Sequence, residues 1–330
     1  MTIRSTSVAL AAEILQREEL VAIPTETVYG LAGNAFSPKA VARIYELKKR
    51  PEQHPLILHT DRLEKVSDWV THFPKSAQKL AERFWPGPLT LVLPKKDVVP
   101  DSITGGKDTV AIRIPNHPLT LELLSQLDFP LVAPSANLFM SVSPTQPSHV
   151  LRYFESELPM VLDGGTCSKG LESTIIGFDG DMPVVYRLGS LSVEDIEHCV
   201  GEVKFPEAND ARVITPGMHP RHYAPQTPLL LTSNPESILN GMIASNLVLL
   251  RFKERLENCY HHQIVLSERG SLKEAASKLY ETLHQLDAFQ FSLIIAERFP
   301  NHGLGKTMND RLERASKSIF DCTSKNIFAE

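Results

Sequence analysis

Short apolar runs of strand length alternate with helix-like segments throughout residues 1–200. Ser7 can cap a helix over 8–18, and Ser37-Pro38 is a favourable cap and first-turn pair for a helix over 39–49. The apolar runs expected to form strands cover 56–60, 89–93, 109–114, 130–133, 160–163, 174–178 and 184–188. Strands interleaved with helices in this way predict an α/β domain built on a mixed sheet.

The composition of the chain changes in residues 203–228, where prolines at 206, 216, 220, 225 and 228 disfavour regular structure. This segment is therefore expected to be a linker. Its Arg221-His222-Tyr223 group is basic and aromatic, unlike a passive spacer, and indicates a lid with Tyr223 as its contact point. The predicted division is a first domain at 1–202, a linker or lid at 203–228, and a second domain at 229–330.

Strand and helix signals recur on a smaller scale in residues 229–330. Strands are expected at 229–232, 246–252 and 292–296, and helices at 235–244, 272–288 and 305–317. This succession predicts a small βαβ domain with a parallel sheet.

The composition is that of a globular enzyme, with 42% hydrophobic and 22% charged residues in a chain of 330. A net charge of −5 gives no general attraction to a nucleic-acid backbone, so stable nucleic-acid binding is not expected. The cysteines form no CxxC pair, which disfavours zinc and predicts reduced thiols in the cytoplasm. The N-terminal apolar stretch 8–12 is too short for a signal peptide or a membrane span.

Polar groups are unusually dense in residues 24–31, directly after the apolar run 20–23. Pro24 ends strand pairing because it has no N–H to donate. Thr25, Glu26 and Thr27 then place two hydroxyls and a carboxylate at a strand end. Gly30 allows a ligand or another backbone to come close. This segment is a candidate binding loop.

Lys48 and Arg50 stand at the expected end of a helix. One interpretation is a solvated cap whose positive charge suits the helix dipole. The other is a phosphate site, because residues two apart in an extended stretch point to one side, and ammonium and guanidinium groups bind phosphates.

Arg113 lies on the same face of the alternating strand 109–114 as Thr109. An arginine in such a strand needs a partner, because burying an unpaired charge is costly. The partner is either an internal aspartate or glutamate, or the carboxylate of an amino-acid ligand held by two hydrogen bonds. The spacing of the residues leaves both open.

Further polar side chains stand near the ends of other predicted strands. Each has an ordinary structural interpretation as well as a functional one, because a lone histidine is often structural and serine and asparagine are common in turns. The candidates are His54, His59, Ser135, Asn137, Ser143, Ser173 and Arg187.

Taken in order, these motifs resemble the Sua5/YciO/YrdC family, the threonylcarbamoyl-AMP synthases. The resemblance rests on residues 24–31, Lys48-x-Arg50, 84–90, 109–115, 133–137, 172–174 and 187–189. It spans the whole chain and implies a YrdC-like catalytic domain with a twisted mixed sheet, followed by a small Rossmann-like βαβ Sua5 domain. It also implies a nucleotidyltransferase that joins L-threonine, bicarbonate and ATP into threonylcarbamoyl-AMP and releases diphosphate.

The resemblance implies a role for each candidate residue. Threonine is expected to be held by Thr27, His59, Arg113, Ala133 and Ser173. ATP is expected to be held by Lys48, Arg50, His54, Thr109, Ser135, Asn137, Ser143, Arg187 and Tyr223. Lys48 and Arg50 are the expected catalytic cations, and Mg²⁺ is expected on the triphosphate without a dedicated protein metal site.

The sequence departs from the family pattern at His54, where asparagine is usual but histidine can still donate a hydrogen bond, and at Phe139-Met140, where Ser-Gly is usual. The product is expected to pass to other proteins for t6A modification of tRNA at adenosine 37. Two alternatives are an RNA-binding or ribosome-associated YrdC-like module, and a carbamoyl transferase of the hydrogenase-maturation type. The acidic net charge disfavours the first. The second family carries zinc-finger and acylphosphatase segments that this sequence lacks.

Overall fold

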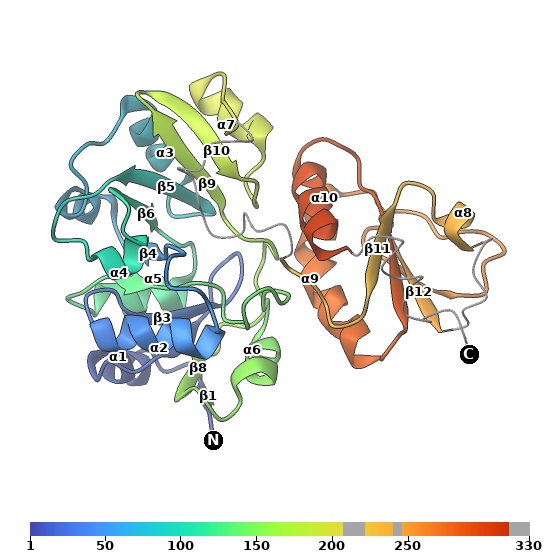
Figure 1. The fold of residues 1–330 in the computed structure, drawn as a ribbon, viewed down its shortest axis with the longest axis horizontal. Coiled ribbons are helices and arrows are strands. Elements are labelled where there is room, and N and C mark those ends of the chain that lie inside the picture. The colour runs from blue at the N-terminus through green and yellow to red at the C-terminus, as the bar shows by residue number, and fades with distance from the viewer. Residues whose placement is uncertain (207–221, 240–245, 317–330) are drawn as a thin grey trace. The chain divides into compact units, whose positions relative to one another are not determined.

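The structure, a computed structural model, describes residues 1–206, 222–239 and 246–316. The chain divides into two compact units (Figure 1). Unit 1 comprises Met1–Phe139 and Ser143–Met218, and unit 2 comprises Met140–Val142 and His219–Glu330.

Unit 1 is built on a mixed sheet whose ten strands run in the order β1-β8-β2-β3-β7-β4-β6-β5-β9-β10 (Figure 1). Parallel pairs (β1·β8, β2·β8, β4·β6, β5·β9) occur beside antiparallel ones (β2·β3, β3·β7, β4·β7, β5·β6, β9·β10). The strands are β1 (Ile3–Ser5), β2 (Val21–Ile23), β3 (Gly30–Asn34), β4 (Ile57–His59), β5 (Leu89–Pro94), β6 (Thr109–Arg113), β7 (Leu131–Val132), β8 (Met160–Leu162), β9 (Thr174–Asp179) and β10 (Met182–Arg187).

Helices cover both faces of this sheet. Side chains alternate along β2, so that Val21 and Ile23 pack on one hydrophobic cluster and Ala22 packs on the other. The expected cap is present, because the Ser37 hydroxyl accepts the Ala40 N–H at 3.2 Å. The helices are α1 (Val8–Gln16), α2 (Pro38–Lys48), the 3₁₀ helix η1 (Leu63–Asp68), α3 (Lys75–Phe84), α4 (Asp101–Thr104), α5 (Pro118–Ser125), α6 (Pro147–Phe154) and α7 (Val193–Val200).

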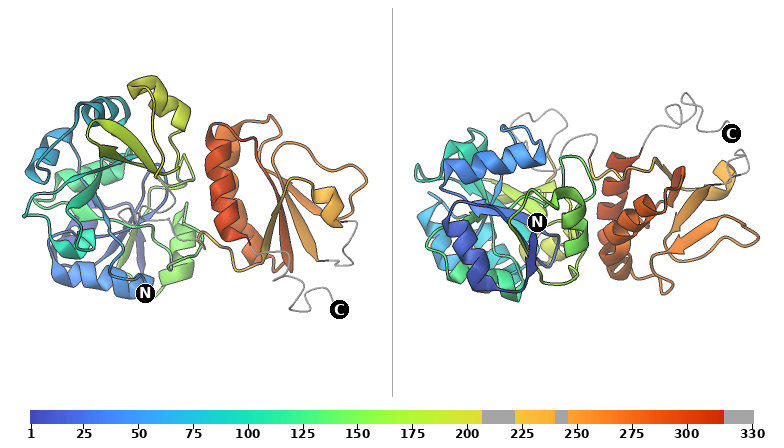
Figure 2. Two further views of the ribbon diagram at one scale, coloured as in Figure 1. Left: turned by 45° about the horizontal axis from the view of Figure 1, so that its top comes forward. Right: turned by 90° about the horizontal axis from the view of Figure 1, so that it is seen from below.

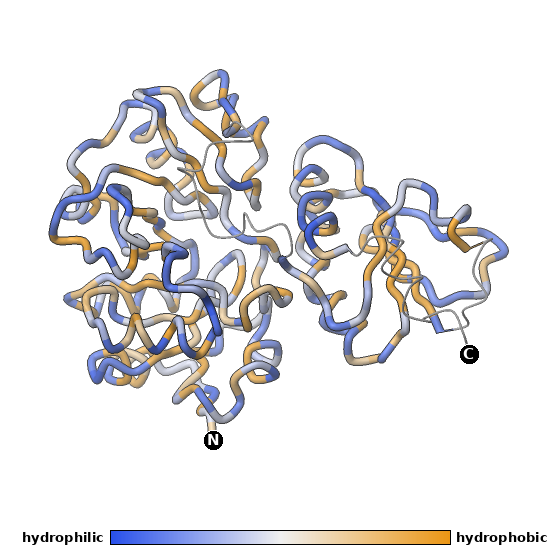
Figure 3. Tube along the Cα trace, viewed as in Figure 1, coloured by the Kyte–Doolittle hydropathy of each residue, from blue (hydrophilic) through white to orange (hydrophobic). Residues whose placement is uncertain are grey.

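Unit 2 has a four-stranded parallel sheet with the order β11-β14-β12-β13. Helices α9 and α10 lie along one face of this sheet and α8 lies on the other (Figures 1 and 2). The strands themselves are largely apolar, as their orange colour shows (Figure 3). The elements are β11 (Leu229–Thr232), α8 (Pro235–Leu239), β12 (Leu247–Arg251), β13 (His262–Val265), α9 (Leu272–Ala288), β14 (Leu293–Glu297) and α10 (Leu304–Ala315).

The mixed sheet of unit 1 and the parallel sheet of unit 2 confirm the predicted fold class. Strands β1, β3 and β13 were not predicted, and several predicted strands are shorter at one or both ends. The division at 1–202, 203–228 and 229–330 stays a prediction, and most of the proposed lid, 207–221, lies outside the described residues. Among the residues that are described, no helix combines the length and apolar character needed to cross a membrane.

Candidate active site

Arg113 forms the centre of a buried polar cluster at the end of β6. Its Nη2 atom lies 2.8 Å from Glu26 Oε1 and donates to Thr27 Oγ1 at 2.9 Å, while Nε donates to the Gly87 carbonyl at 3.3 Å. The Arg113 and Glu26 side chains are each only 5% exposed. Of the two partners that the sequence left open, the internal carboxylate is therefore present. No described residue accepts a hydrogen bond from Nη1, so the guanidinium keeps donors for a ligand.

His59 lies beside Arg113 because β4 and β6 pair in parallel with these two residues in register. The His59 Nδ1–H donates to the Ile57 carbonyl at 2.9 Å, which leaves Nε2 as an acceptor in the neutral ring. Burial, and then the positive charge of Arg113, lower the pKa of His59 to about 3. The ring is consequently neutral at physiological pH and can accept a hydrogen bond from a ligand hydroxyl.

Ala133 and the loop 24–30 approach each other closely at the same place in the sheet. The Ala133 N–H donates to the Ile57 carbonyl at 3.3 Å, which continues the pairing of β7 with β4. A Cβ on Gly30 would lie 3.0 Å from the Ala133 Cβ, so another backbone, as the sequence allowed, occupies the space that glycine leaves. The loop that carries Thr27 thus leads into a strand that packs directly on Ala133, and the two segments form one wall of the site.

Ser173 and Arg187 contact each other, although the resemblance divides them between threonine and ATP. The Arg187 Nη2 donates to the Ser173 carbonyl at 2.8 Å and to its Oγ at 3.1 Å. The Ser173 Oγ also lies 2.8 Å from the Thr90 hydroxyl of β5. Ser173 precedes β9 and Arg187 ends β10, so the antiparallel hairpin of these strands brings them together.

Lys48 is 1% exposed and binds a loop far from it in the sequence. Its Nζ donates to the Ser135 carbonyl at 2.5 Å and to the Asn137 carbonyl at 2.7 Å. Burial, and then the nearby charge of Arg50, lower the pKa of Lys48 well below its usual range. Two of the three ammonium protons are therefore used inside the protein, and one remains for a ligand oxygen.

The expectation that Lys48 and Arg50 lie in an extended stretch is wrong. Lys48 is the last residue of α2, and Lys49 adopts a left-handed conformation at φ 52°. This turn caps the helix, because the Lys49 N–H donates to the Glu46 carbonyl and the Arg50 N–H to the Tyr45 carbonyl. The two cations come together through the turn.

Arg50, His54 and Phe139 form an aromatic and cationic group beside Lys48. The Arg50 guanidinium lies 5.8 Å from the Phe139 ring centroid, and the His54 ring lies 5.4 Å from it. Arg50 Nη2 also donates to the Pro55 carbonyl at 3.2 Å. The two departures from the family pattern, His54 and Phe139, are therefore neighbours in space and pack on each other.

Thr109 begins β6, at the opposite end of the strand from Arg113. Extending the β4·β6 register by two residues places Thr109 beside Pro55, whose carbonyl binds Arg50. Arg113 lies four positions beyond Thr109 along the strand, which corresponds to about 13 Å. One strand pair therefore carries the cation group at one end and the Arg113 cluster at the other.

Ser143 and Asn137 are both buried in unit 1. The Ser143 hydroxyl donates to Glu172 Oε1 at 2.7 Å, and the Asn137 amide donates to the Leu138 carbonyl at 2.8 Å. Both side chains thus have protein contacts of their own.

Tyr223 belongs to unit 2 and is 1% exposed there. The Arg311 guanidinium lies 4.5 Å from its ring centroid, and Tyr280 stacks on it at 6.1 Å. These contacts account for the burial of the ring, and a role of Tyr223 in covering ATP stays a prediction.

The sequence interpretation placed Glu26 in a candidate binding loop without giving it a role, and it missed Glu172 and Thr90 as members of the site. Each contacts a candidate: Glu26 pairs with Arg113, Glu172 with Ser143, and Thr90 with Ser173. The sequence could have indicated Glu26 as the partner of Arg113, because Glu26 stands within the polar loop and an arginine in a strand needs a partner. Glu172 and Thr90 lie within family motifs, but nothing local indicates which residue they contact.

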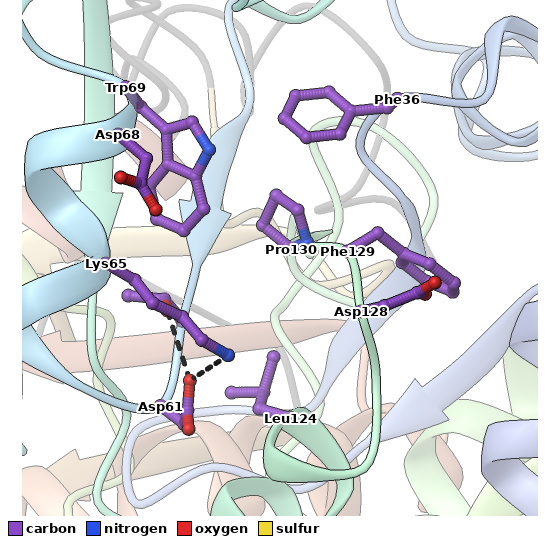
Figure 4. A pocket seen from close by; sticks show the side chains of 10 residues that line it. Phe36, Asp61, Lys65, Asp68, Trp69, Leu124, Asp128, Phe129 and Pro130 are labelled. Carbon is purple, nitrogen blue, oxygen red and sulfur yellow. Dashed lines mark hydrogen bonds and ion pairs between the residues drawn. The ribbon is translucent and has the colours of Figure 1, made fainter.

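A cavity of about 170 Å³ lies next to the site but contains none of the predicted residues (Figure 4). Thr60, which follows His59, forms part of its wall, and Asp61 in the cavity pairs with Lys65 at 2.8 Å (Figure 4). Asp68 and Asp128 also line it, so the cavity carries three carboxylates against one ammonium. This charge disfavours a phosphate there.

No group of three or more histidine, cysteine or acidic side chains in the described part of the chain could hold a metal ion.

Two family models match the chain. The Sua5/YciO/YrdC model, described as "Telomere recombination", matches residues 13–189. The model of the threonylcarbamoyl-AMP synthase C-terminal domain matches residues 191–317. The chain belongs to the Sua5/YciO/YrdC family.

Relatives in this family match over nearly the whole chain. The threonylcarbamoyl-AMP synthase of Pyrococcus abyssi is 38% identical, with 95% of each chain covered. That of Bacillus subtilis is also 38% identical, covering 94% of this chain and 92% of the relative. The crystal structure of P. abyssi Sua5 complexed with L-threonine has a TM-score of 0.86 and 35% identity, with 96% of this chain and 97% of that chain covered.

Proposed function

We propose that this protein synthesises threonylcarbamoyl-AMP from L-threonine, bicarbonate and ATP and releases diphosphate. The observation that carries the proposal is the arrangement of the β4·β6 strand pair. The Arg113 cluster at one end is suited to the carboxylate of an amino acid, and the cations at the other end are suited to phosphate groups. The full-length similarity to synthases that carry this name supports it.

Threonine binds at the Arg113 end. The guanidinium donates to the carboxylate of threonine, since its Nη1 is not used by the described residues. The neutral His59 ring accepts from the threonine hydroxyl through Nε2. Thr27, Ser173 and the Ala133 backbone complete the wall, and the hydrogen bonds between Thr27 and Arg113 and between Ser173 and Thr90 hold it rigid.

ATP binds at the Lys48 end. Arg50 and the remaining proton of Lys48 contact phosphate oxygens, and both cations are already desolvated, which strengthens their interaction with an anion. The Lys48 bonds to the Ser135 and Asn137 carbonyls fix the loop expected to contact the nucleotide. His54, Thr109, Ser143 and Arg187 are the remaining proposed ATP contacts.

The chemistry needs positioning and charge rather than a protein nucleophile. The threonine ammonium first loses a proton to solvent, and bicarbonate gives CO₂ and hydroxide. The neutral amine then adds to CO₂, so that an N–C bond forms while one C–O π bond opens to a carboxylate oxygen, and the proton lost from nitrogen joins the hydroxide as water. A carbamate oxygen then attacks the α-phosphorus of ATP, which forms an O–P bond while the bond to the β-phosphate oxygen breaks and diphosphate leaves. Lys48 and Arg50 stabilise the negative charge that develops on the leaving group, and Mg²⁺ carried with ATP adds charge stabilisation.

The product is a reactive mixed anhydride, so we propose that it passes to other proteins that complete t6A at adenosine 37 of tRNA. The thiols of Cys167, Cys199 and Cys259 are free, which supports a role in a reducing compartment such as the cytoplasm. A stable RNA-binding module is less well supported, because the net charge of the chain is −5.

The test is to incubate the protein with L-threonine, bicarbonate, ATP and Mg²⁺ and to follow nucleotide and phosphate products. We expect diphosphate and an adenylate that carries threonine, formed only when threonine and bicarbonate are both present. Release of ADP and inorganic phosphate as the main products would rule out the proposal.

A further inference from the structure

We propose that Glu26 is a specificity-determining residue that makes the threonine end of the site select a zwitterion over an anion. The inference rests on the proposed function, in which Arg113 receives the carboxylate of the amino acid. It concerns the charge of the ligand and not the identity of its side chain.

Glu26 is fixed beside Arg113 by contacts on both of its carboxylate oxygens. Oε1 lies 2.8 Å from Arg113 Nη2, and Oε2 accepts the Asn116 N–H at 3.0 Å. The Glu26 backbone carbonyl also accepts the Lys169 N–H at 2.7 Å. The carboxylate is therefore held in place when a ligand arrives and cannot swing out to solvent.

Hydrogen bonding leaves Glu26 Oε1 incompletely satisfied. This oxygen is fully buried, and its contact with Arg113 Nη2 is close in distance but outside hydrogen-bond geometry, so no hydrogen bond reaches it. A buried acceptor in this state keeps most of its negative potential. That potential extends toward the position where Arg113 binds the ligand carboxylate.

The histidines and the thiol at this end of the site contribute little charge. His59 is neutral because its pKa is lowered to about 3, and burial raises the pKa of the Cys167 thiol to about 12. The pKa of His117, which lies near Glu26, is also lowered by burial. Arg113 and Glu26 thus nearly cancel where they meet, and Arg187, which donates to Ser173, adds a further positive charge on the Ser173 side.

A site with a buried carboxylate beside the arginine that binds the ligand carboxylate suits a ligand that carries both a negative and a positive charge. The carboxylate of a zwitterionic amino acid faces Arg113, and its ammonium is attracted by Glu26. A ligand that lacks the ammonium still meets Arg113 but carries a net negative charge toward a buried carboxylate. Charges about 5 Å apart at an effective dielectric constant of about 20 correspond to a factor of roughly 250, and repulsion of the ammonium by Arg113 lowers the expected preference for the zwitterion to about 10- to 100-fold.

The experiment compares two ligands on two proteins by calorimetric titration of the full chain. The ligands are L-threonine and 2,3-dihydroxybutanoate, in which a hydroxyl replaces the ammonium. We expect wild type to prefer threonine by at least 10-fold, and Glu26→Gln to reduce that preference to about 3-fold or less. The control variant Glu46→Gln removes an exposed ion pair with Arg43 on α2 and should leave the preference unchanged.

The outcomes separate selection from a purely structural role. If Glu26 only holds Arg113 in place, Glu26→Gln weakens both ligands by the same factor, and the proposal is overturned. Equal affinity of wild type for the two ligands overturns it as well, whether or not the variant folds. If wild type binds no threonine at all, the proposed function has failed instead.

Discussion

Replacing Arg113 should cost both stability and threonine affinity, and the structure allows the two effects to be separated. In Arg113→Ala the carboxylate of Glu26 stays buried beside an empty space, with only the Asn116 N–H to stabilise it. Breaking a buried ion pair on one side typically costs about 3–5 kcal/mol. We therefore expect the free energy of unfolding to fall by about that amount.

The binding effect has a different origin. Losing a charge-assisted contact to the carboxylate of threonine should weaken binding by about 2–4 kcal/mol, or roughly 30- to 1000-fold. The KM for ATP should change far less, because Thr109, at the end of β6 that lies beside the Pro55 carbonyl bound by Arg50, is about 13 Å along the strand from Arg113.

The double variant Arg113→Met with Glu26→Gln separates the two contributions. It removes both charges at similar volume, so most of the lost stability should return while threonine binding stays lost. Urea unfolding followed by fluorescence measures the first quantity, and calorimetric titration with threonine and with ATP measures the second. The reasoning is refuted if the double variant is no more stable than Arg113→Ala, or if either variant loses ATP affinity and keeps threonine affinity.

Three further changes probe the other parts of the site. Lys48→Met removes two hydrogen bonds to carbonyls and the phosphate contact, so the KM for ATP should rise about 10- to 100-fold with little change for threonine, and equal effects on both substrates would contradict the assignment. His59 has a folded pKa of about 3 against about 6.5 unfolded, so the unfolded state binds more protons between these values. Stability should therefore fall by up to about 1.4 kcal/mol for each pH unit lowered within that window, and His59→Asn should flatten this slope in acid unfolding. An unchanged slope would show that His59 is not buried in its neutral form. Tyr223→Phe keeps the ring beside Arg311 and removes the hydroxyl. If Tyr223 is part of a lid, this variant should hydrolyse the adenylate faster at unchanged stability. An unchanged rate of adenylate loss would limit Tyr223 to packing in unit 2.

Elements with strong local signals could be predicted from the sequence. Ser37 caps α2 as its residue type indicates, and the apolar runs 89–93 and 174–178 lie within β5 and β9. Strand β3 was missed because Gly30 and Gly33 lower its strand propensity, and the strand exists because tertiary contacts override that weakness. A Cβ at Gly33 would lie 2.8 Å from Leu20, which shows how close the packing is. Strand β13 carries a histidine and a glutamine in four residues and gives no clear pattern.

The same distinction, between local sequence signals and contacts of distant segments, applies to the candidate site. The order of the motifs along the sequence was sufficient to identify Arg113, His59 and Ser173 as candidate site residues. The fold then brings His59 into register with Arg113. The partners could not be predicted, because they depend on contacts between distant segments. The sequence favours a solvated or phosphate-facing Lys48, whereas the folded chain buries its ammonium against two carbonyls of another loop.

The distribution of charge assigns the two ends of the strand pair independently of the family resemblance. At one end, the positive charge of Arg113 is balanced by the buried carboxylate of Glu26. At the other, Lys48 is solvated only by carbonyl dipoles, contacts no carboxylate among the described residues, and has its pKa lowered further by Arg50. A desolvated ammonium without a carboxylate beside it is stabilised most by a multiply charged anion, which the guanidinium of Arg50 can also contact, whereas a balanced pair is stabilised most by a zwitterion. Exchanging the ligands between the ends would place a triphosphate against Glu26 and leave Lys48 without a counter-charge. The electrostatics therefore favour threonine at Arg113 and ATP at Lys48, and not the reverse.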